Sequence, residues 1–184
     1  QSVVVVLLNY FPAQLQPESA PQIAKYAYGK DYHFIIKEKL KQLQAFIDGQ
    51  APNESMVYCD SAPVLERRWA QRAGLGWIGK SGLLIHPTLG SYCLIGELIT
   101  TLPLDYDTPQ KERCGTCTAC IKACPTQALS AYEVNANRCI SYLTIEHRDT
   151  ISEEFTSRMG NRLFDCDACL DACPWNKKAK FHSC

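Results

Sequence analysis

Apolar residues in the first half of the chain form short runs and stripes that predict alternating strands and helices. Residues 3–10 are almost continuously β-branched or aliphatic, which predicts a buried strand. Between residues 32 and 47, apolar positions recur at steps of four, three and four with lysines between them, the pattern of an amphipathic helix. Residues 56–59 predict a second, shorter strand that ends at Asp60.

The next segments extend this alternation. Pro63 suits the first turn of a helix, and Gly74 suits its C-terminal cap. Residues 82–85 and 92–95 are apolar runs joined by a turn rich in proline and glycine, which predicts a β-hairpin. We therefore expect an α+β or α/β fold with a mixed sheet covered by helices.

The character of the sequence changes after Pro109. Cysteines crowd in, the regular apolar period fades, and only short helices between loops are predicted. We place a domain boundary near residue 107, with an α/β domain in 1–107 and a cysteine-rich domain in 108–184. The second domain contains a weak repeat, because C-x2-C-x3-C-P occurs from Cys117 and again from Cys166.

Composition adds few constraints. Nineteen basic residues balance nineteen acidic ones, so the net charge does not favour a nucleic-acid partner and does not exclude one. No apolar stretch approaches the roughly 20 residues that span a bilayer, and no signal peptide is apparent. We expect a cytoplasmic protein with no membrane partner. The first residue is Gln1 rather than methionine, so we expect that the α/β domain is truncated at its N-terminus.

The cysteine spacing indicates iron–sulfur clusters. Residues 114–125 read C-x2-C-x2-C-x3-C-P, the run that holds [4Fe–4S] clusters in two-cluster ferredoxins, where the fourth cysteine serves the other cluster. The first predicted ligand set is Cys114, Cys117, Cys120 and Cys173. The second is Cys124, Cys166, Cys169 and, because it lies between the two motifs, Cys139.

Two other uses of cysteine remain possible. Zinc sites usually pair two separate C-x2-C knuckles, which differs from three cysteines in tandem. Disulfides belong to secreted chains and do not need this spacing. Cys59 and Cys93 lie in apolar runs and are expected to be small core residues, and Cys184 at the chain end is expected to have no ligand role.

Several longer strings resemble the epoxyqueuosine reductase family, whose members complete queuosine in the anticodon of certain tRNAs. These strings are GKDYH at 29–33, DSAPVLE at 60–66, AGLGWIGK at 73–80 and CISYLTIE at 139–146. The chain also carries GNR at 160–162 and CPWN at 173–176. The resemblance covers nearly the whole chain, and AGLGWIGK and CISYLTIE are far more specific than the ferredoxin motif.

The resemblance implies a cobalamin in the α/β domain, beside a ferredoxin-like module with two [4Fe–4S] clusters. It implies a two-electron, two-proton removal of the epoxide oxygen as water. Asp60 matches the family's proposed general acid, although an aspartate at this place also suits a helix cap. Further candidates for the cobalamin and substrate pocket, each of which also has an ordinary structural use, are Tyr32, His33, Gly74, Gly76, Trp77, Gly79 and Lys80.

The resemblance also implies partners. These are a tRNA with a queuosine-type anticodon and an electron donor such as a flavodoxin or ferredoxin. Family members carry an additional N-terminal segment and a C-terminal helical-repeat region that helps to grip tRNA, and this sequence shows neither. Lys30 and Ser81 stand where the family suggests arginine and asparagine. Two rivals remain: a reductive dehalogenase-like cobalamin enzyme, and a non-enzymatic two-cluster electron carrier.

Overall fold

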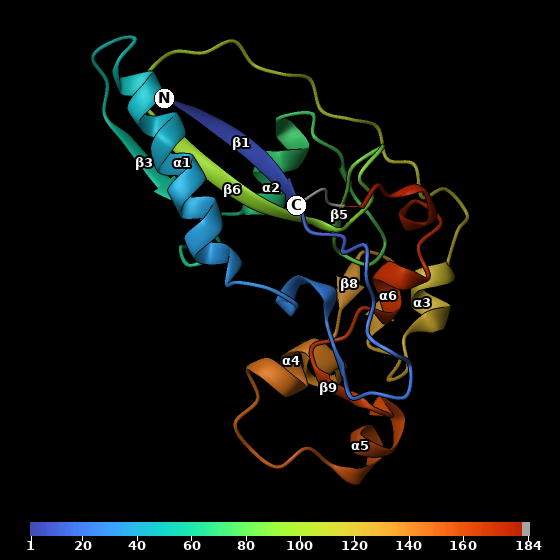
Figure 1. The fold of residues 1–184 in the computed structure, drawn as a ribbon. Coiled ribbons are helices and arrows are strands. Elements are labelled where there is room, and N and C mark those ends of the chain that lie inside the picture. Colours follow the sequence, from blue (N-terminus) through green and yellow to red (C-terminus); the bar gives the residue numbers. More distant parts are fainter. Residues whose placement is uncertain (182–184) are drawn as a thin grey trace.

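The computed structural model describes residues 1–181 and has a three-stranded sheet at one end and the cysteine-rich segments at the other (Figure 1). The sheet has the order β1-β6-β3, formed by β1 (Ser2–Asn9), β6 (Cys93–Thr100) and β3 (Ser55–Tyr58). Both neighbouring pairs are antiparallel. The predicted mixed α/β class is therefore correct, but the central sheet is not mixed in strand direction.

Two helices cover opposite faces of this sheet. The helix α1 (Tyr32–Asp48) packs on β3 and β6, and α2 (Glu66–Arg72) packs on β6 and β1. Successive residues of a strand point to opposite faces. Accordingly, a Cβ on Gly96 would lie 2.6 Å from Ile36 of α1, whereas the next residue, Glu97, lies beside Glu66 of α2.

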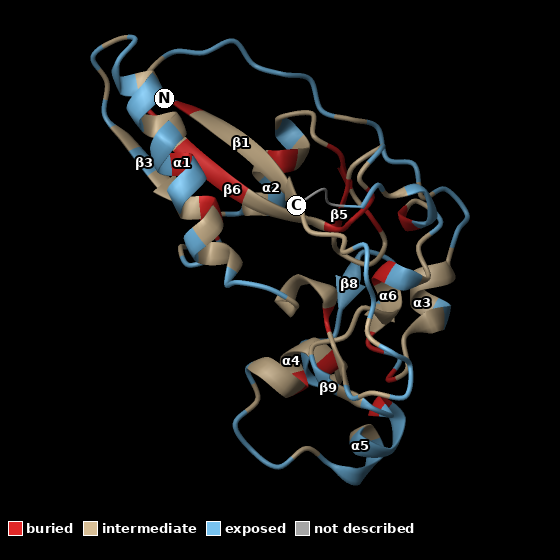
Figure 2. Ribbon diagram, in the orientation of Figure 1, coloured by how far each residue is buried: buried red, intermediate tan, exposed pale blue. Residues whose placement is uncertain are grey.

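A small apolar core holds α1 to the sheet. Ile36 and Leu40 of α1 pack with Cys59, and residues of all three strands surround them. Full burial of a leucine contributes about 2–3 kcal/mol. Cys59 is therefore a core residue, as its sequence context predicts. Figure 2 shows buried positions along β6, whereas the long connection after it is exposed.

The predicted strand and helix at the N-terminus are confirmed within one residue, but two other predictions are wrong. Residues 82–85 and 92–95 do not form a hairpin. Instead, β5 (Leu84–Ile85) pairs with β4 (Trp77–Ile78), and β6 continues to Thr100 at the centre of the sheet. The helix expected from Pro63 begins only at Glu66, because Pro63 lies in a tight turn that Val64 N closes by donating to Ala62 O.

The cysteine-rich half consists of short elements. Its helices are α3 (Ala119–Ala123), α4 (Ile140–Ile145), α5 (Glu153–Met159) and α6 (Ala168–Asp171). Its strands are β7 (Leu129–Ser130), β8 (Glu133–Val134) and β9 (Arg162–Phe164). Single 3-10 turns lie at Ala136–Arg138 and Asn176–Lys178. Cys184 lies outside the described residues.

The segment between β1 and α1 crosses to the cysteine-rich half. Its strand β2 (Gln22–Ile23) pairs in parallel with β9, and a 3-10 turn (Lys25–Ala27) follows. Lys25 Nζ then contacts Asp167 at 3.2 Å and Asp171 at 2.7 Å. The N-terminal segment is therefore part of the packing of both halves. Within residues 1–181, every helix is too short or too polar to traverse a lipid bilayer.

Candidate functional site

Asp60 occupies a tight turn directly after β3. Its φ of 57° is left-handed, a conformation that aspartate and asparagine tolerate better than most residues. Its backbone N–H donates to Glu66 Oε1 of α2 at 2.5 Å. This bond fixes the turn and leaves the Asp60 carboxyl 61% exposed, at the edge of a cavity.

The first turn of α1 brings two further predicted residues to Asp60. Tyr32 OH donates to Asp60 Oδ2 at 3.0 Å, and His33 Nε2 lies 3.3 Å from the same oxygen. His33 Nδ1 lies 2.7 Å from Asp31 Oδ1, so the imidazole bridges two carboxyl groups. Burial and the hydrogen bond to Asp60 raise the pKa of Tyr32, so its phenol keeps its proton and remains a donor.

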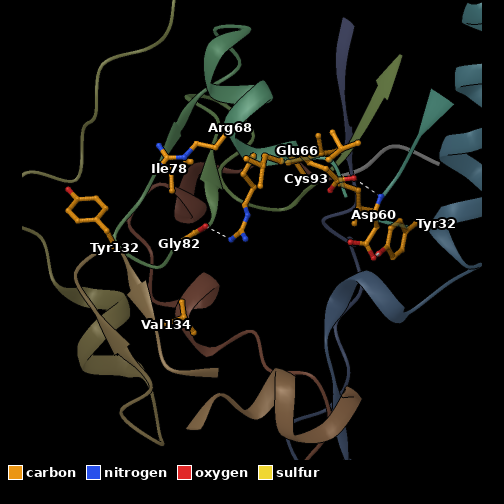
Figure 3. Close-up of a pocket in the computed structure, with 14 residues that line it drawn as sticks. Tyr32, Asp60, Glu66, Arg68, Ile78, Gly82, Cys93, Tyr132 and Val134 are labelled. Carbon is orange, nitrogen blue, oxygen red and sulfur yellow. Dashed lines mark hydrogen bonds between the residues drawn. The ribbon is translucent and has the colours of Figure 1, made fainter. Parts of the chain in front are cut away.

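These groups border a cavity of about 710 Å³ (Figure 3). Tyr32 and Asp60 lie at one end of it, and Tyr132 lies at the opposite end. Arg67 also lines the cavity, and its Nη1 donates to Gly82 O at 2.5 Å. The remaining lining is mostly apolar and includes Val64, Leu65, Ile78, Leu94 and Ile95. The cavity suits a large ligand with an apolar body and polar edges.

Two carboxyl groups face each other beneath this cavity. Glu97 is 0% exposed, and neither of its carboxyl oxygens finds a hydrogen-bond donor among residues 1–181. Burial and the neighbouring Glu66 raise the pKa of Glu97 to about 8, and burial also raises the pKa of Glu66. Two ionised carboxylates cannot hydrogen-bond to each other, whereas one shared proton satisfies both. The raised pKa favours a protonated Glu97 that shares its proton with Glu66, and Glu66 in turn holds the Asp60 turn.

The two cysteine motifs face each other across a pair of short helices. The helices α3 and α6, each inside one C-x2-C-x3-C motif, pack together. Cys120 therefore lies near Cys173 and Cys117, and Cys169 lies near Cys166, Cys139 and also Cys120. Burial is the largest cause that raises the pKa values of Cys120 and Cys169, and these neighbouring thiols add to it. These neighbours are compatible with an exchange of the last cysteine between the motifs, which stays a prediction.

A second cavity of about 450 Å³ lies among the cysteines. Its lining includes all four members of the second predicted ligand set: Cys124, Cys139, Cys166 and Cys169. It adjoins the Asp60 cavity, because Arg67, Cys93, Leu94 and Val134 line both. In the described part of the chain, no three His, Cys, Asp or Glu side chains converge on a position for a single metal ion. The cysteines surround a space instead, which suits a multi-iron cluster.

Residues 74–80 lie against the first cysteine loop and pack closely on the chain itself. A Cβ on Gly76 would lie 2.2 Å from Ile85 O, and one on Gly74 would lie 2.8 Å from Thr108 O. A Cβ on Gly79 would lie 2.4 Å from Ile85 Cδ1. Lys80 Nζ donates to the carbonyls of Gly115 and Cys117 at 2.5 and 3.0 Å.

This placement gives the segment a role in packing. The three glycines admit neighbouring protein atoms rather than open space, and Gly74, Gly76, Trp77, Gly79 and Lys80 do not line the Asp60 cavity. That these five residues contact cobalamin stays a prediction.

Sequence reasoning did not identify two residues of the site. Glu97 is the only charged residue in β6, and a lone carboxylate in a central strand was a usable signal. The sequence offered no such signal for Arg67, which faces both cavities only because of how α2 is oriented.

Two family models match separate parts of the chain. Residues 113–176 match a 4Fe-4S double cluster binding domain. Residues 1–61 match a model described as epoxyqueuosine reductase QueG, DUF1730. The cysteine-rich half therefore contains a double-cluster binding domain.

Comparisons over the whole chain also match epoxyqueuosine reductases. The chain is 52% identical to an epoxyqueuosine reductase of Leadbetterella byssophila over 100% of its own length and 61% of that protein. It superposes on an epoxyqueuosine reductase of Streptococcus thermophilus with a TM-score of 0.91, at 32% identity over 98% of this chain and 50% of that one.

A third match is an epoxyqueuosine reductase crystallised with an epoxyqueuosine-modified tRNA-Tyr stem loop, with a TM-score of 0.88 and 34% identity. It covers 98% of this chain and 50% of the matched one. Reductive dehalogenases share the fold at 17% identity and a TM-score of 0.67. The chain spans about 60% of the length of the curated relatives that it matches.

Proposed function

We propose, from the premise that this chain belongs to the epoxyqueuosine reductase family, that it forms the catalytic core for the reduction of epoxyqueuosine to queuosine in tRNA. The observation that carries the proposal is the meeting of two cavities. One presents the Asp60 carboxyl with Tyr32 and His33, and the other is lined by four cysteines. The proposed proton donor and the proposed redox centre would thus border adjoining cavities.

We assign two [4Fe–4S] clusters to the double-cluster domain. Cys114, Cys117, Cys120 and Cys173 would hold the first cluster, and Cys124, Cys139, Cys166 and Cys169 would hold the second. The proximities of Cys120 to Cys173 and of Cys139 to Cys166 and Cys169 support this assignment. The second site borders the Asp60 cavity, whereas the first lies against residues 77–80.

The lining of the Asp60 cavity suits a corrin ring. The cavity of about 710 Å³ has an apolar body, and Arg67 and Arg68 offer donors to the amides at the edge of the ring. Tyr32 and His33 would border the cofactor and the substrate at the Asp60 end. Bound cobalamin would supply a reduced cobalt that delivers electrons to the epoxide carbon.

The reaction requires protons that this chain can deliver. Two electrons and two protons break both C–O bonds of the epoxide, form the C=C bond and release the oxygen as water. Asp60 would protonate that oxygen, and His33 Nε2, 3.3 Å from Asp60 Oδ2, would return a proton to it. His33 is 32% exposed and can therefore exchange protons with solvent. Tyr32 keeps its own proton and orients the Asp60 carboxyl.

The substrate and the reductant come from other molecules. The modified base would reach the Asp60 cavity from a tRNA anticodon stem-loop, which places the reaction in the cytoplasm. The electrons would come from a flavodoxin or ferredoxin. With equal numbers of acidic and basic residues, this chain offers no overall attraction to RNA.

The test is a product mass. The full-length protein is reconstituted anaerobically with iron, sulfide, cobalamin and a strong reductant, and is given an anticodon stem-loop that bears epoxyqueuosine. We expect the released nucleoside to lose one oxygen. Asp60→Asn should abolish this loss while both clusters and cobalamin stay bound in visible spectra. The exposed Asp149→Asn is the matched control and should retain full activity.

Three outcomes would refute the proposal. An unchanged nucleoside mass with all cofactors bound would indicate that the enzyme acts on another substrate, and organohalides would be tested next. An unchanged mass with no cobalamin bound would indicate an electron carrier. Full activity of Asp60→Asn would remove the assigned proton donor.

A further inference from the structure

Trp77 is a buried residue whose polar atom lacks a partner. The side chain is 0% exposed, and among residues 1–181 its Nε1 has no acceptor in hydrogen-bonding geometry. A buried indole N–H normally finds a partner, because leaving it unpaired costs about 1–3 kcal/mol. Residues 77–78 form the short strand β4 and pack tightly, so the ring orientation is fixed.

The Trp77 ring lies between the two segments that carry ligands of the first cluster. On one side is Cys114: a Cβ on Gly79 would lie 3.4 Å from its Sγ, and the guanidinium of Arg113 is 5.7 Å from the Trp77 ring centroid. On the other side is Trp175, two residues after Cys173, with the ring centroids 4.8 Å apart at 74°. One indole thus neighbours residues that adjoin both Cys114 and Cys173.

The indole N–H is also close to a ligand sulfur. The Lys80 backbone and the Trp77 side chain both approach the Cys114 thiol from the donor side. No protein acceptor completes the geometry of the Trp77 donor. A cluster held by Cys114 would bring both a thiolate and inorganic sulfides, which are negatively charged acceptors, next to that N–H.

We infer that Trp77 donates its indole N–H to a sulfur of the first cluster and raises the reduction potential of that cluster. The inference rests on the proposed ligand assignment. Lys80 assists from the same segment, because its ammonium binds the Gly115 and Cys117 carbonyls and places positive charge beside the cluster loop. Hydrogen bonds to cluster sulfurs favour the more negative, reduced state and are one of the factors that set the potential.

The experiment measures both cluster potentials by EPR-monitored redox titration of the reconstituted full-length protein. Trp77→Phe keeps an aromatic ring against Trp175 and removes the N–H. We expect the reduced fraction of one cluster to fall about tenfold at a fixed potential, which equals about 59 mV for a one-electron couple, with the other cluster unchanged. Trp69→Phe is the matched control, because Trp69 also lies under an arginine but far from the cysteines.

A second variant separates hydrogen bonding from folding. If Trp77→Phe loses a cluster, β-(3-benzothienyl)alanine at position 77 keeps the shape and replaces N–H with sulfur. It should lower the same potential and remove one exchangeable-proton coupling from the pulsed EPR spectrum. Unchanged potentials in an intact Trp77→Phe protein, or equal shifts in Trp69→Phe, would overturn the inference. These readouts are independent of turnover, so loss of the proposed epoxide reduction would not decide them.

Discussion

The shared proton between Glu97 and Glu66 makes the stability of this fold depend on pH. Glu97 lies in the central strand β6 and has no exposed surface, and its neighbours on this face include Glu66 and the Asp60 carboxyl. Its pKa rises from 4.5 to about 8 on folding, mainly by burial. Between these values the folded protein holds a proton that the unfolded chain has lost. Stability therefore falls as pH rises through this window.

The size of this effect follows from the two pKa values. Each pH unit between them costs about 1.36 kcal/mol, so Glu97 removes about 2–3 kcal/mol of unfolding free energy between pH 5.5 and pH 7.5. Glu97→Gln keeps a donor to Glu66 and cannot ionise. We therefore expect the stability of Glu97→Gln relative to wild type to rise by about 2–3 kcal/mol over this range.

Urea unfolding of the metal-free, reduced protein, followed by tryptophan fluorescence at a series of pH values, measures this difference. Subtracting wild type at each pH cancels the titration of the other groups. Glu38→Gln, an exposed position on α1, is the control and should give a flat difference. A flat difference for Glu97→Gln as well would refute the shared proton.

Two further substitutions test the packing and the ligand exchange. Gly76→Ala places a methyl group 2.2 Å from Ile85 O and should lower the unfolding free energy by about 1–3 kcal/mol in the same assay. Gly29→Ala is the control, because its methyl group would meet nothing within 4 Å. Equal losses of unfolding free energy in the two variants would contradict the packing argument. Cys139→Ser should change the EPR signal of one cluster and leave the other intact, whereas Cys59→Ala, in the α1 core, should change neither. Two unaffected signals in Cys139→Ser would remove Cys139 from the ligand set.

Local sequence patterns predicted the elements that depend on one stretch of chain. The periodicity of residues 32–47 and the apolar run at 3–10 each match a single element, because burial of one face or of both imposes that pattern. The hairpin prediction failed because an apolar run does not specify its partner. Leu84 and Ile85 pair with residues 77–78 instead, and the lone charge at Glu97 concealed how far β6 extends.

Some features of the site could be predicted from local sequence, whereas others depend on elements that meet only in the folded chain. The cysteine spacing is a local constraint and was readable from the sequence, as was the position of Asp60 at the end of a strand. The pairing of Glu97 with Glu66 depends on two elements that meet only in the folded chain. The same holds for Arg67, which lines both cavities, and for Trp77, which joins segments 36 or more residues away.

The parallel pairing of β2 with β9 has a consequence for protease digestion. The stretch 103–113 is mostly exposed and has no regular secondary structure, so it is the natural site of a cut between the halves (Figure 2). Such a nick would leave residues 22–25 bound to β9 and to Asp167, and Asn161 bound to the Glu18 carbonyl. Two fragments would appear on a denaturing gel, yet they would elute as one particle under native conditions.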